Sequence, residues 1–167
     1  ITPNTRVIAL AHVTNVIGDV RPLKEIINYA HKHNILVIVD GAQSVPHMSV
    51  DVKDLDIDFL AFSSHKMLGP NGVGILYGKY KLLEEMEPVI LGGGMNASFL
   101  ANKTVVYNNI PNRFEAGTPN IADVIAFKNS IQYINEIGID NINRHELELK
   151  KYLVDKLSLN PNIIMYN

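Results

Sequence analysis

A lysine stands just ahead of a glycine-rich turn in the stretch SSHKMLGPNGVGILYG, residues 63–78. Gly69 and Gly74 have the spacing of a phosphate-binding P-loop, which requires a lysine and then a serine or threonine directly after the second glycine. An isoleucine and a leucine occupy these two positions, and they open a strand pattern rather than a helix. The sequence therefore argues against a P-loop, and the chemistry of Lys66 must be sought where that lysine stands.

Lys66 follows the predicted buried strand DIDFLAFS, and Asp40 is the last residue of another, ILVIVD. In an open α/β sheet, ligands collect beyond the carboxyl ends of the strands, so we expect both side chains in one crevice. A lysine amine can form a Schiff base with an aldehyde, and a carboxylate can keep a pyridine nitrogen protonated. These are a protein's two main contributions to pyridoxal phosphate (PLP) chemistry. Taken singly, the lysine is more typical of a solvated surface and the aspartate of a helix cap, so the inference depends on the pair.

The apolar pattern of the first eighty residues predicts a βαβ unit followed by two more strands. The predicted strands are Arg6–Asn15, Ile35–Asp40, Asp56–Ser63 and Gly72–Gly78, and the first predicted helix is Arg21–Asn34. Strand, helix and strand with short links imply parallel strands joined by a right-handed crossover. The predicted fold class is therefore α/β, with a mostly parallel central sheet and flanking helices.

The rest of the chain is predicted to consist of loops and helices, with one further strand at its end. Turn residues predict loops at Leu91–Asn96 and Asn112–Asn120. The predicted helices are Lys79–Met86, Ile121–Glu136 and Asp140–Leu157, the last two separated by Gly138. The final residues, NIIMYN, have the pattern of a strand that is just beginning.

Composition places the chain among ordinary globular proteins. It has 167 residues, of which 47% are hydrophobic and 19% charged, and its formal net charge is −2. Without a basic run, neither nucleic acid nor an anionic membrane is an expected partner, and no apolar stretch is long enough to cross a bilayer. Cysteine is absent, which removes disulfides, a thiolate nucleophile and a cysteine metal site from this chain, and no metal is expected.

Four stretches carry a specific family resemblance: LAHVTNVIGDV, VIVDGAQSVPH, DIDFLAFSSHKMLGPNGVGILYG and NRFEAGTPN. In order along nearly the whole chain, they resemble the PLP-dependent cysteine desulfurases. The resemblance is strongest to the group II, SufS-like branch of the class V aminotransferases, which have PLP fold type I. It implies that residues 1–138 are part of the PLP-binding large domain. Residues 139–167 would be the long helix and first strand that lead into a truncated, smaller C-terminal domain.

The resemblance implies a role for each matching residue around the cofactor ring. Lys66 would be the Schiff-base lysine and later the acid and base that moves the substrate α-proton. Asp40 would pair with the pyridinium nitrogen, and Gln43 would hydrogen-bond the phenolic oxygen of the cofactor. Ala42 would pack flat against the ring, where a larger side chain would collide with it.

The same resemblance assigns residues to the phosphate, the substrate and a second subunit. Ser63 and His65 would bind the phosphate, and His65 is also a candidate catalytic residue beside Lys66. Asn15 would lie near the substrate carboxylate. Thr118 would reach the phosphate of the neighbouring subunit's cofactor, which implies a homodimer. Structural alternatives remain open: Asn15 could organise the turn that follows it, Gln43 could bond backbone, and Thr118 could be a helix-entry residue.

The implied reaction converts L-cysteine to L-alanine and an enzyme persulfide, which supplies sulfur for iron–sulfur cluster assembly, usually through a SufE-like acceptor. In the family, the cysteine that forms the persulfide and the arginine that grips the substrate carboxylate lie farther along the chain. We therefore interpret this sequence as a fragment that would be inactive alone, fold poorly and bind PLP weakly, because a lone terminal strand leaves its backbone groups unpaired. The alternative is a natural short relative without cysteine.

Competing functions follow from the same residues. A selenocysteine lyase or another class V aminotransferase is the alternative among enzymes, since Lys66 and Asp40 are needed by every PLP enzyme of this fold. A non-catalytic PLP-fold scaffold is the alternative outside the enzymes, and the joint presence of Lys66, Asp40, Gln43 and His65 disfavours it. The expected location is cytoplasmic in a bacterium or a plastid-type organelle, the apicoplast, in a eukaryotic parasite.

Overall fold

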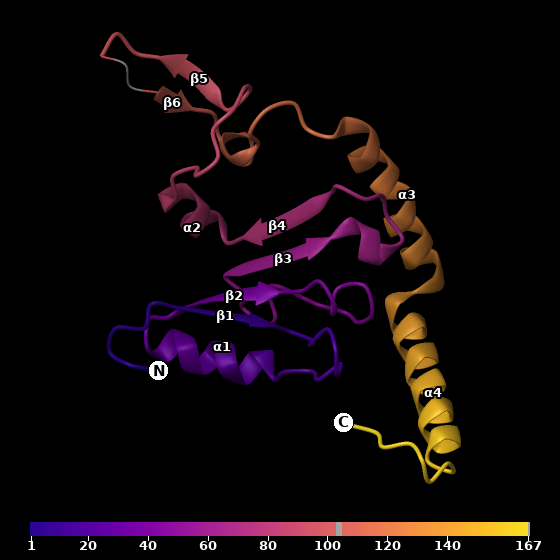
Figure 1. Ribbon diagram of the computed structural model, residues 1–167. Coiled ribbons are helices and arrows are strands. Elements are labelled where there is room, and N and C mark those ends of the chain that lie inside the picture. The colour runs from indigo at the N-terminus through magenta and orange to yellow at the C-terminus, as the bar shows by residue number, and fades with distance from the viewer. Residues whose placement is uncertain (103–104, 167) are drawn as a thin grey trace.

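The fold is described by a computed structural model for residues 1–102 and 105–166 (Figure 1). At its centre lies a four-stranded sheet with the order β1-β2-β3-β4. Its strands are β1 (Val7–Ala11), β2 (Leu36–Asp40), β3 (Phe59–Ser63) and β4 (Gly74–Gly78). β2 runs parallel to β1 and to β3, whereas β4 is antiparallel to β3. The predicted α/β class with a mostly parallel sheet is confirmed.

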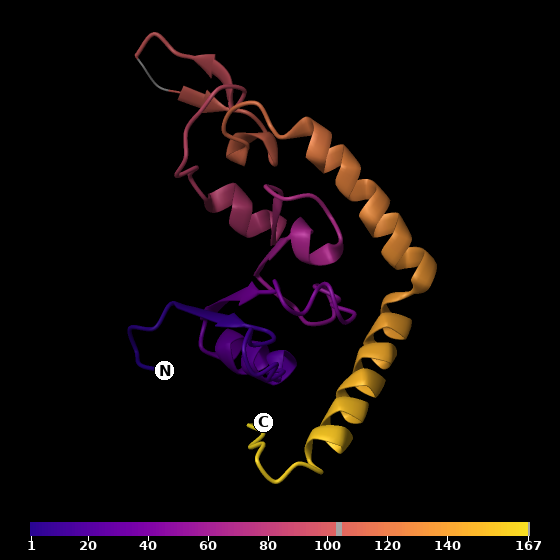
Figure 2. The same ribbon diagram turned by 45° about the vertical axis from the view of Figure 1, so that its right-hand side comes forward.

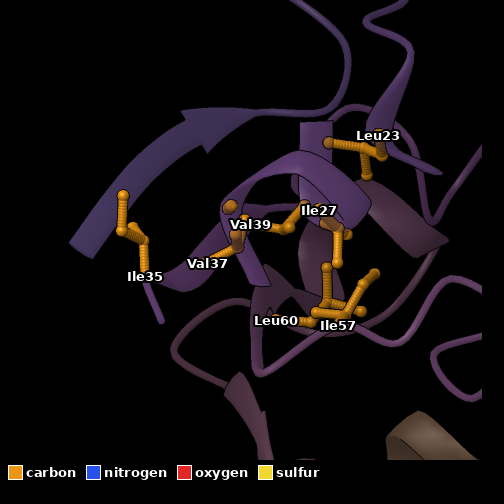
Figure 3. Packing of buried hydrophobic residues seen from close by; sticks show 8 residues of the cluster. Leu23, Ile27, Ile35, Val37, Val39, Ile57 and Leu60 are labelled. Carbon is orange, nitrogen blue, oxygen red and sulfur yellow. The ribbon is translucent and has the colours of Figure 1, made fainter. Parts of the chain in front are cut away.

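Helix α1 (Leu23–Lys32) connects β1 to β2 and covers one face of the sheet. The helix begins directly after Pro22, whose ring fixes a backbone angle suited to a first helical turn. Leu23, Ile27 and Ala30 form its buried stripe at helical spacing. Figure 3 shows this stripe packed against aliphatic side chains of β2 and β3. Each large aliphatic side chain buried there contributes about 1.5–3 kcal/mol to folding.

The two faces of β2 differ because successive side chains point to opposite sides of a strand. Val37 and Val39 are fully buried in the core under α1. Ile38 and Asp40 point to the other face and are exposed. The last residue of β2 therefore presents its carboxylate on the side of the sheet that the core does not occupy.

The main sheet is followed by a β-hairpin, which was not predicted from the sequence. After α2 (Tyr80–Glu85), strands β5 (Asn96–Phe99) and β6 (Val105–Tyr107) pair in antiparallel fashion and extend away from the main sheet (Figure 1). The predicted loop Leu91–Asn96 is correct up to the first residue of β5. The hairpin was missed because its strands are short and its only pairing is to each other.

Two long helices precede the last described residues. Helix α3 (Ile121–Ile137) and helix α4 (Ile139–Leu157) meet at Gly138, whose φ of 86° is accessible mainly to glycine. They run along one side of the molecule (Figure 2). The 3-10 turn η2 (Asn112–Phe114) lies in the predicted loop before α3. Among the described residues, no helix has both the length and the apolar character needed to span a membrane.

The predicted terminal strand is wrong for the residues that the structure describes. Residues 163–166 have no regular secondary structure, and Asn167 lies outside the described part of the chain. A strand is defined by hydrogen bonds to a neighbouring strand, and no described strand lies against this segment. The division between residues 1–138 and 139–167 stays a prediction, although the bend at Gly138 falls at the same point.

Candidate active site

The carboxyl ends of three strands bring most of the predicted site residues to one edge of the sheet. Asp40, the last residue of β2, is paired with Ala11 at the end of β1 and with Ala61 in β3. Ser63 ends β3 two residues farther on. The segments that follow β1, β2 and β3 therefore leave the sheet side by side, as expected for ligand sites in α/β folds.

The turn after β2 fixes the Asp40 carboxylate through one of its two oxygens and leaves the other available. The Ala42 backbone N–H donates to Asp40 Oδ1 over 2.9 Å, and the Gly41 N–H donates to the Ala61 carbonyl over 2.8 Å. A Cβ on Gly41 would lie 2.6 Å from Leu60 Cδ1 and 3.0 Å from Val45 Cγ2, so a larger residue in this turn would force those side chains to shift. Asp40 Oδ2 accepts no hydrogen bond from any described residue and is free to accept one from a ligand.

Gln43 and Asn15 are brought into direct contact. The side-chain amide of Gln43 donates to the side-chain oxygen of Asn15, which joins the turn after β2 to the loop after β1. That loop is closed on itself, because the Asp19 N–H donates to Thr14 Oγ1 over 3.0 Å. A cleft of about 440 Å³ lies beside it and is lined by Asn15, Asp19 and four neighbours. Gln43 thus bonds a side chain here, and not backbone.

Lys66 is carried by a short turn that is fixed from within. β3 runs directly into the 3-10 turn η1 (Ser64–Met67), in which His65 is exposed and Lys66 is half-buried. Ser64 is fully buried, and its hydroxyl donates to the carbonyls of Val73, over 3.1 Å, and Pro70. The Gly69 N–H returns to the Ser64 carbonyl over 3.0 Å. The turn therefore has little freedom, while the Lys66 amine and the His65 ring remain accessible.

His12 is a residue next to this site that the sequence analysis did not single out. It directly follows β1, its backbone N–H donates to the Asp40 carbonyl over 2.9 Å, and its side chain is 5% exposed. Burial lowers the pKa of His12, and Nδ1 has no hydrogen-bond partner in the described part of the chain. The sequence feature that could have identified His12 is its place directly after a buried strand, two residues before Thr14, which forms the following turn.

Thr118 is not brought together with the other predicted site residues. It is exposed in the segment between η2 and α3 and forms no hydrogen bond with them in the structure as described. Asn120, not Thr118, directly precedes α3. The predicted contact of Thr118 with a neighbouring subunit's cofactor stays a prediction.

The assembled groups suit one class of ligand. A half-buried amine, a carboxylate with a free oxygen, and the hydroxyl and imidazole of Ser63 and His65 follow neighbouring strands. Ala42 adds a small side chain in the turn that holds the carboxylate. Such a set can bind an aldehyde covalently, hold a pyridine nitrogen protonated and accommodate a phosphate.

The chain is similar to known proteins along its whole length. The family model for "Aminotransferase class-V" matches residues 1–167. A "Probable cysteine desulfurase" from Halalkalibacterium halodurans is 46% identical over 99% of this chain and 41% of its own length. The crystal structure of the cysteine desulfurase CsdA from Escherichia coli superimposes with a TM-score of 0.92 at 39% identity, covering 96% of this chain and 40% of CsdA.

A solved structure with lower sequence identity to this chain contains PLP. The protein C-DES, in a variant with glycine covalently linked to its PLP cofactor, gives a TM-score of 0.86 at 27% identity, over 96% of this chain and 43% of C-DES. The chain spans about two-fifths of the length of the relatives it matches.

Proposed function

Because this chain belongs to the aminotransferase class-V family, we propose that it forms part of a PLP-dependent cysteine desulfurase. The enzyme would convert L-cysteine to L-alanine and pass the sulfur to a protein thiol. The observation that carries the proposal is the parallel register of β2 and β3, with Asp40 opposite Ala61 and the Lys66 turn directly beyond. The similarity to named cysteine desulfurases supports the choice of substrate.

The residues of this chain divide the work as follows. The Lys66 amine would hold the cofactor aldehyde and would move the substrate α-proton. Asp40 Oδ2 would accept a hydrogen bond from the protonated pyridine nitrogen, while the Ala42 N–H holds Oδ1 in place. When bound, PLP supplies an electron sink for the carbanion formed at the substrate α-carbon.

Neighbouring residues orient cofactor and substrate. Ser63 and His65 would hold the phosphate, and the small Ala42 side chain would leave room for the ring, with which a larger side chain would collide. Gln43, which here donates to Asn15, would donate to the phenolic oxygen once released from this partner. Asn15 would then be available to the substrate carboxylate from the adjoining cleft.

The sulfur acceptor is proposed to lie outside this chain. The sequence holds no cysteine, so the thiol that takes the sulfur must belong to another part of the protein or to a partner. We assign the enzyme to the group II, SufS-like branch on LAHVTNVIG and RFEAGTPN. That branch implies a homodimer, a SufE-like acceptor, delivery of sulfur to iron–sulfur assembly, and a bacterial cytoplasmic or plastid-type location.

The test uses the complete protein with L-cysteine, with and without a SufE-like acceptor. With a thiol reductant present to release sulfide from the persulfide, equal amounts of alanine and sulfide, increased by the acceptor, are expected. Reduction with borohydride followed by peptide mass analysis should place the cofactor on Lys66, and Lys66→Ala should lose it. Release of pyruvate and ammonia in place of alanine would reveal a lyase, and turnover of selenocysteine alone would reveal a selenocysteine lyase. Absence of any bound PLP would refute the proposal.

A further inference from the structure

We infer that α3 and α4 form one brace that positions the two cofactor-binding turns relative to each other, an inference that rests on the proposed PLP site. The first is the Lys66 turn, residues 63–70, and the second is the Gln43 turn, residues 41–48. Each turn is tied to a different helix of the pair. Neither helix contributes a residue that we assign to the cofactor, so the tied residues act as positioning residues.

Helix α3 holds the Lys66 turn at its far end. Ser130 Oγ donates to the Leu68 carbonyl over 2.9 Å, a bond between residues 62 apart in sequence. Leu68 has a φ of 59°, a conformation that costs energy for a branched side chain, so it needs outside support. Phe127 of α3 also supports the turn, because its buried ring, 7% exposed, packs closely against Gly69. A Cβ on Gly69 would lie only 2.6 Å from Phe127 Cδ2.

Helix α4 holds the Gln43 turn. His47 Nδ1 lies 2.8 Å from Glu146 Oε1, and Asn143 Nδ2 donates to the His47 carbonyl over 3.0 Å. Asn143 and Glu146 are three residues apart and therefore share one face of the helix. Within the turn, the His47 N–H donates to the carbonyl of buried Ser44, which directly follows Gln43.

The two helices are joined rigidly enough to act together. Only Gly138 separates them, and the bend is closed by bonds from the Gly138 N–H to the Ile134 carbonyl, 2.8 Å, and from the Ile142 N–H to the Gly138 carbonyl, 3.1 Å. In Figure 1, α3 passes beside the turn that ends β3 and α4 continues past the neighbouring loop. Joined in this way, the two helices hold the Gln43 turn in a fixed place relative to Lys66.

The ties on α4 are suited to positioning more than to stability. The side chains of His47 and Glu146 are 45% and 41% exposed. Pairs this exposed stabilise folding little, because water and salt screen them. Their removal should thus be felt mainly in the geometry of the cofactor site.

The experiment uses the complete enzyme with PLP as the probe. Glu146→Gln and His47→Phe are each expected to weaken PLP binding roughly three- to tenfold, the equilibrium equivalent of one hydrogen bond, and the double variant no further. Ser130→Ala should shift the pH titration of the visible absorption band of the bound cofactor, and Ser130→Thr, which keeps the hydroxyl, should restore it. Glu148→Gln, an exposed change on the same helix, should match the wild type.

The outcomes separate positioning from simple structural support. Unchanged PLP affinity and an unchanged pH titration in Glu146→Gln and Ser130→Ala would overturn the inference, whether or not the melting temperature falls. Strictly additive losses in the double variant would overturn the shared link between His47 and Glu146. Borohydride labelling of Lys66 in the wild type distinguishes this failure from failure of the proposed function, since labelling requires the cofactor but not the brace.

Discussion

The polar side chains at the two edges of the main sheet differ in whether the chain itself supplies their bonding partners. At the amino edge of β2 and β3, Asp58 is buried and fully paired. Its carboxylate accepts from Lys79 Nζ over 2.8 Å and from the Val37 N–H over 2.8 Å, and lies 2.8 Å from His31 Nε2. Asp56 adds a second carboxylate, 3.0 Å from His31 Nδ1, and also pairs with Lys79.

At the carboxyl edge, the corresponding groups are left accessible. Asp40 is exposed with one oxygen free among the described residues, and His65 is exposed beside half-buried Lys66. Charges that are mutually satisfied stabilise a fold but have no bonding capacity left for a ligand. The comparison teaches that the same residue types act as a structural clamp at one edge and as a binding site at the other, depending on whether their partners come from the chain.

Lys66→Ala should give the largest effect, and an effect on chemistry alone. Loss of the covalent amine and of proton transfer is expected to lower kcat more than about 10³-fold. Because Lys66 forms no ion pair in the described structure, the free energy of unfolding of the cofactor-free enzyme should stay nearly unchanged. Turnover of L-cysteine and urea unfolding measure the two quantities. A large loss of stability would contradict the division between the edges.

Asp58→Ala should have the opposite effect, on the free energy of unfolding and not on the chemistry. It leaves Lys79 and His31 without their buried partner, and we expect a loss of about 3 kcal/mol in the free energy of unfolding. The matched control is Asp54→Asn, which breaks an exposed pair with Lys24 and should cost less than about 1 kcal/mol. Urea unfolding of both variants is the measurement, and equal costs would show that burial of the network is unimportant.

Gly69→Ala tests how tightly the accessible edge is packed from behind. The added methyl would lie 2.6 Å from Phe127 Cδ2 and 2.8 Å from the Ser64 carbonyl oxygen. A loss of stability of about 2 kcal/mol is expected, together with weaker PLP binding. Gly93→Ala is the control, since a Cβ there meets no described atom within 4 Å. If thermal melting ranks the two variants alike, the Lys66 turn is not closely packed.

The smallest expected effect is a pH dependence of the free energy of unfolding, caused by Asp56 and Asp58 at the amino edge. Burial alone would raise the pKa of Asp58, but hydrogen bonds from Lys79, His31 and the Val37 amide outweigh burial and hold it below 3.8. The pKa of Asp56 is likewise lowered, mainly by the bond from Lys79. A lowered folded pKa gives stability that is complete above 3.8 and is lost as pH falls through the folded value.

The corresponding measurement is urea unfolding between pH 6 and pH 2. Each carboxylate should contribute at most about 1.4 kcal/mol per pH unit to the decline. Asp58→Asn should flatten this decline. At alkaline pH the sign reverses for Lys79: burial lowers its pKa, but the bonds to Asp56 and Asp58 raise it above 10.5. Its contribution is therefore present below 10.5 and is lost as pH rises through the folded value.

The sequence by itself determined the elements whose signals are local. Apolar runs marked the four strands, Pro22 and Gly138 marked helix boundaries, and Lys66 and Asp40 were identified because Asp40 ends one strand and Lys66 follows another. Strand boundaries were too generous, as at Arg6–Asn15, where the ladder ends at Ala11. An apolar run states where a strand can form, while its length depends on the neighbour that pairs with it.

The tertiary structure decided everything that depends on partners far apart in sequence. It paired Gln43 with Asn15, tied His47 to Glu146, gathered His31, Asp58 and Lys79 into one network, formed the β5–β6 hairpin and left residues 163–166 without a strand. Hydrogen bonds and ion pairs between distant residues leave no periodic trace in the chain. Side-chain types and spacing locate the chemistry, but only folding decides which charges neutralise one another and which remain available.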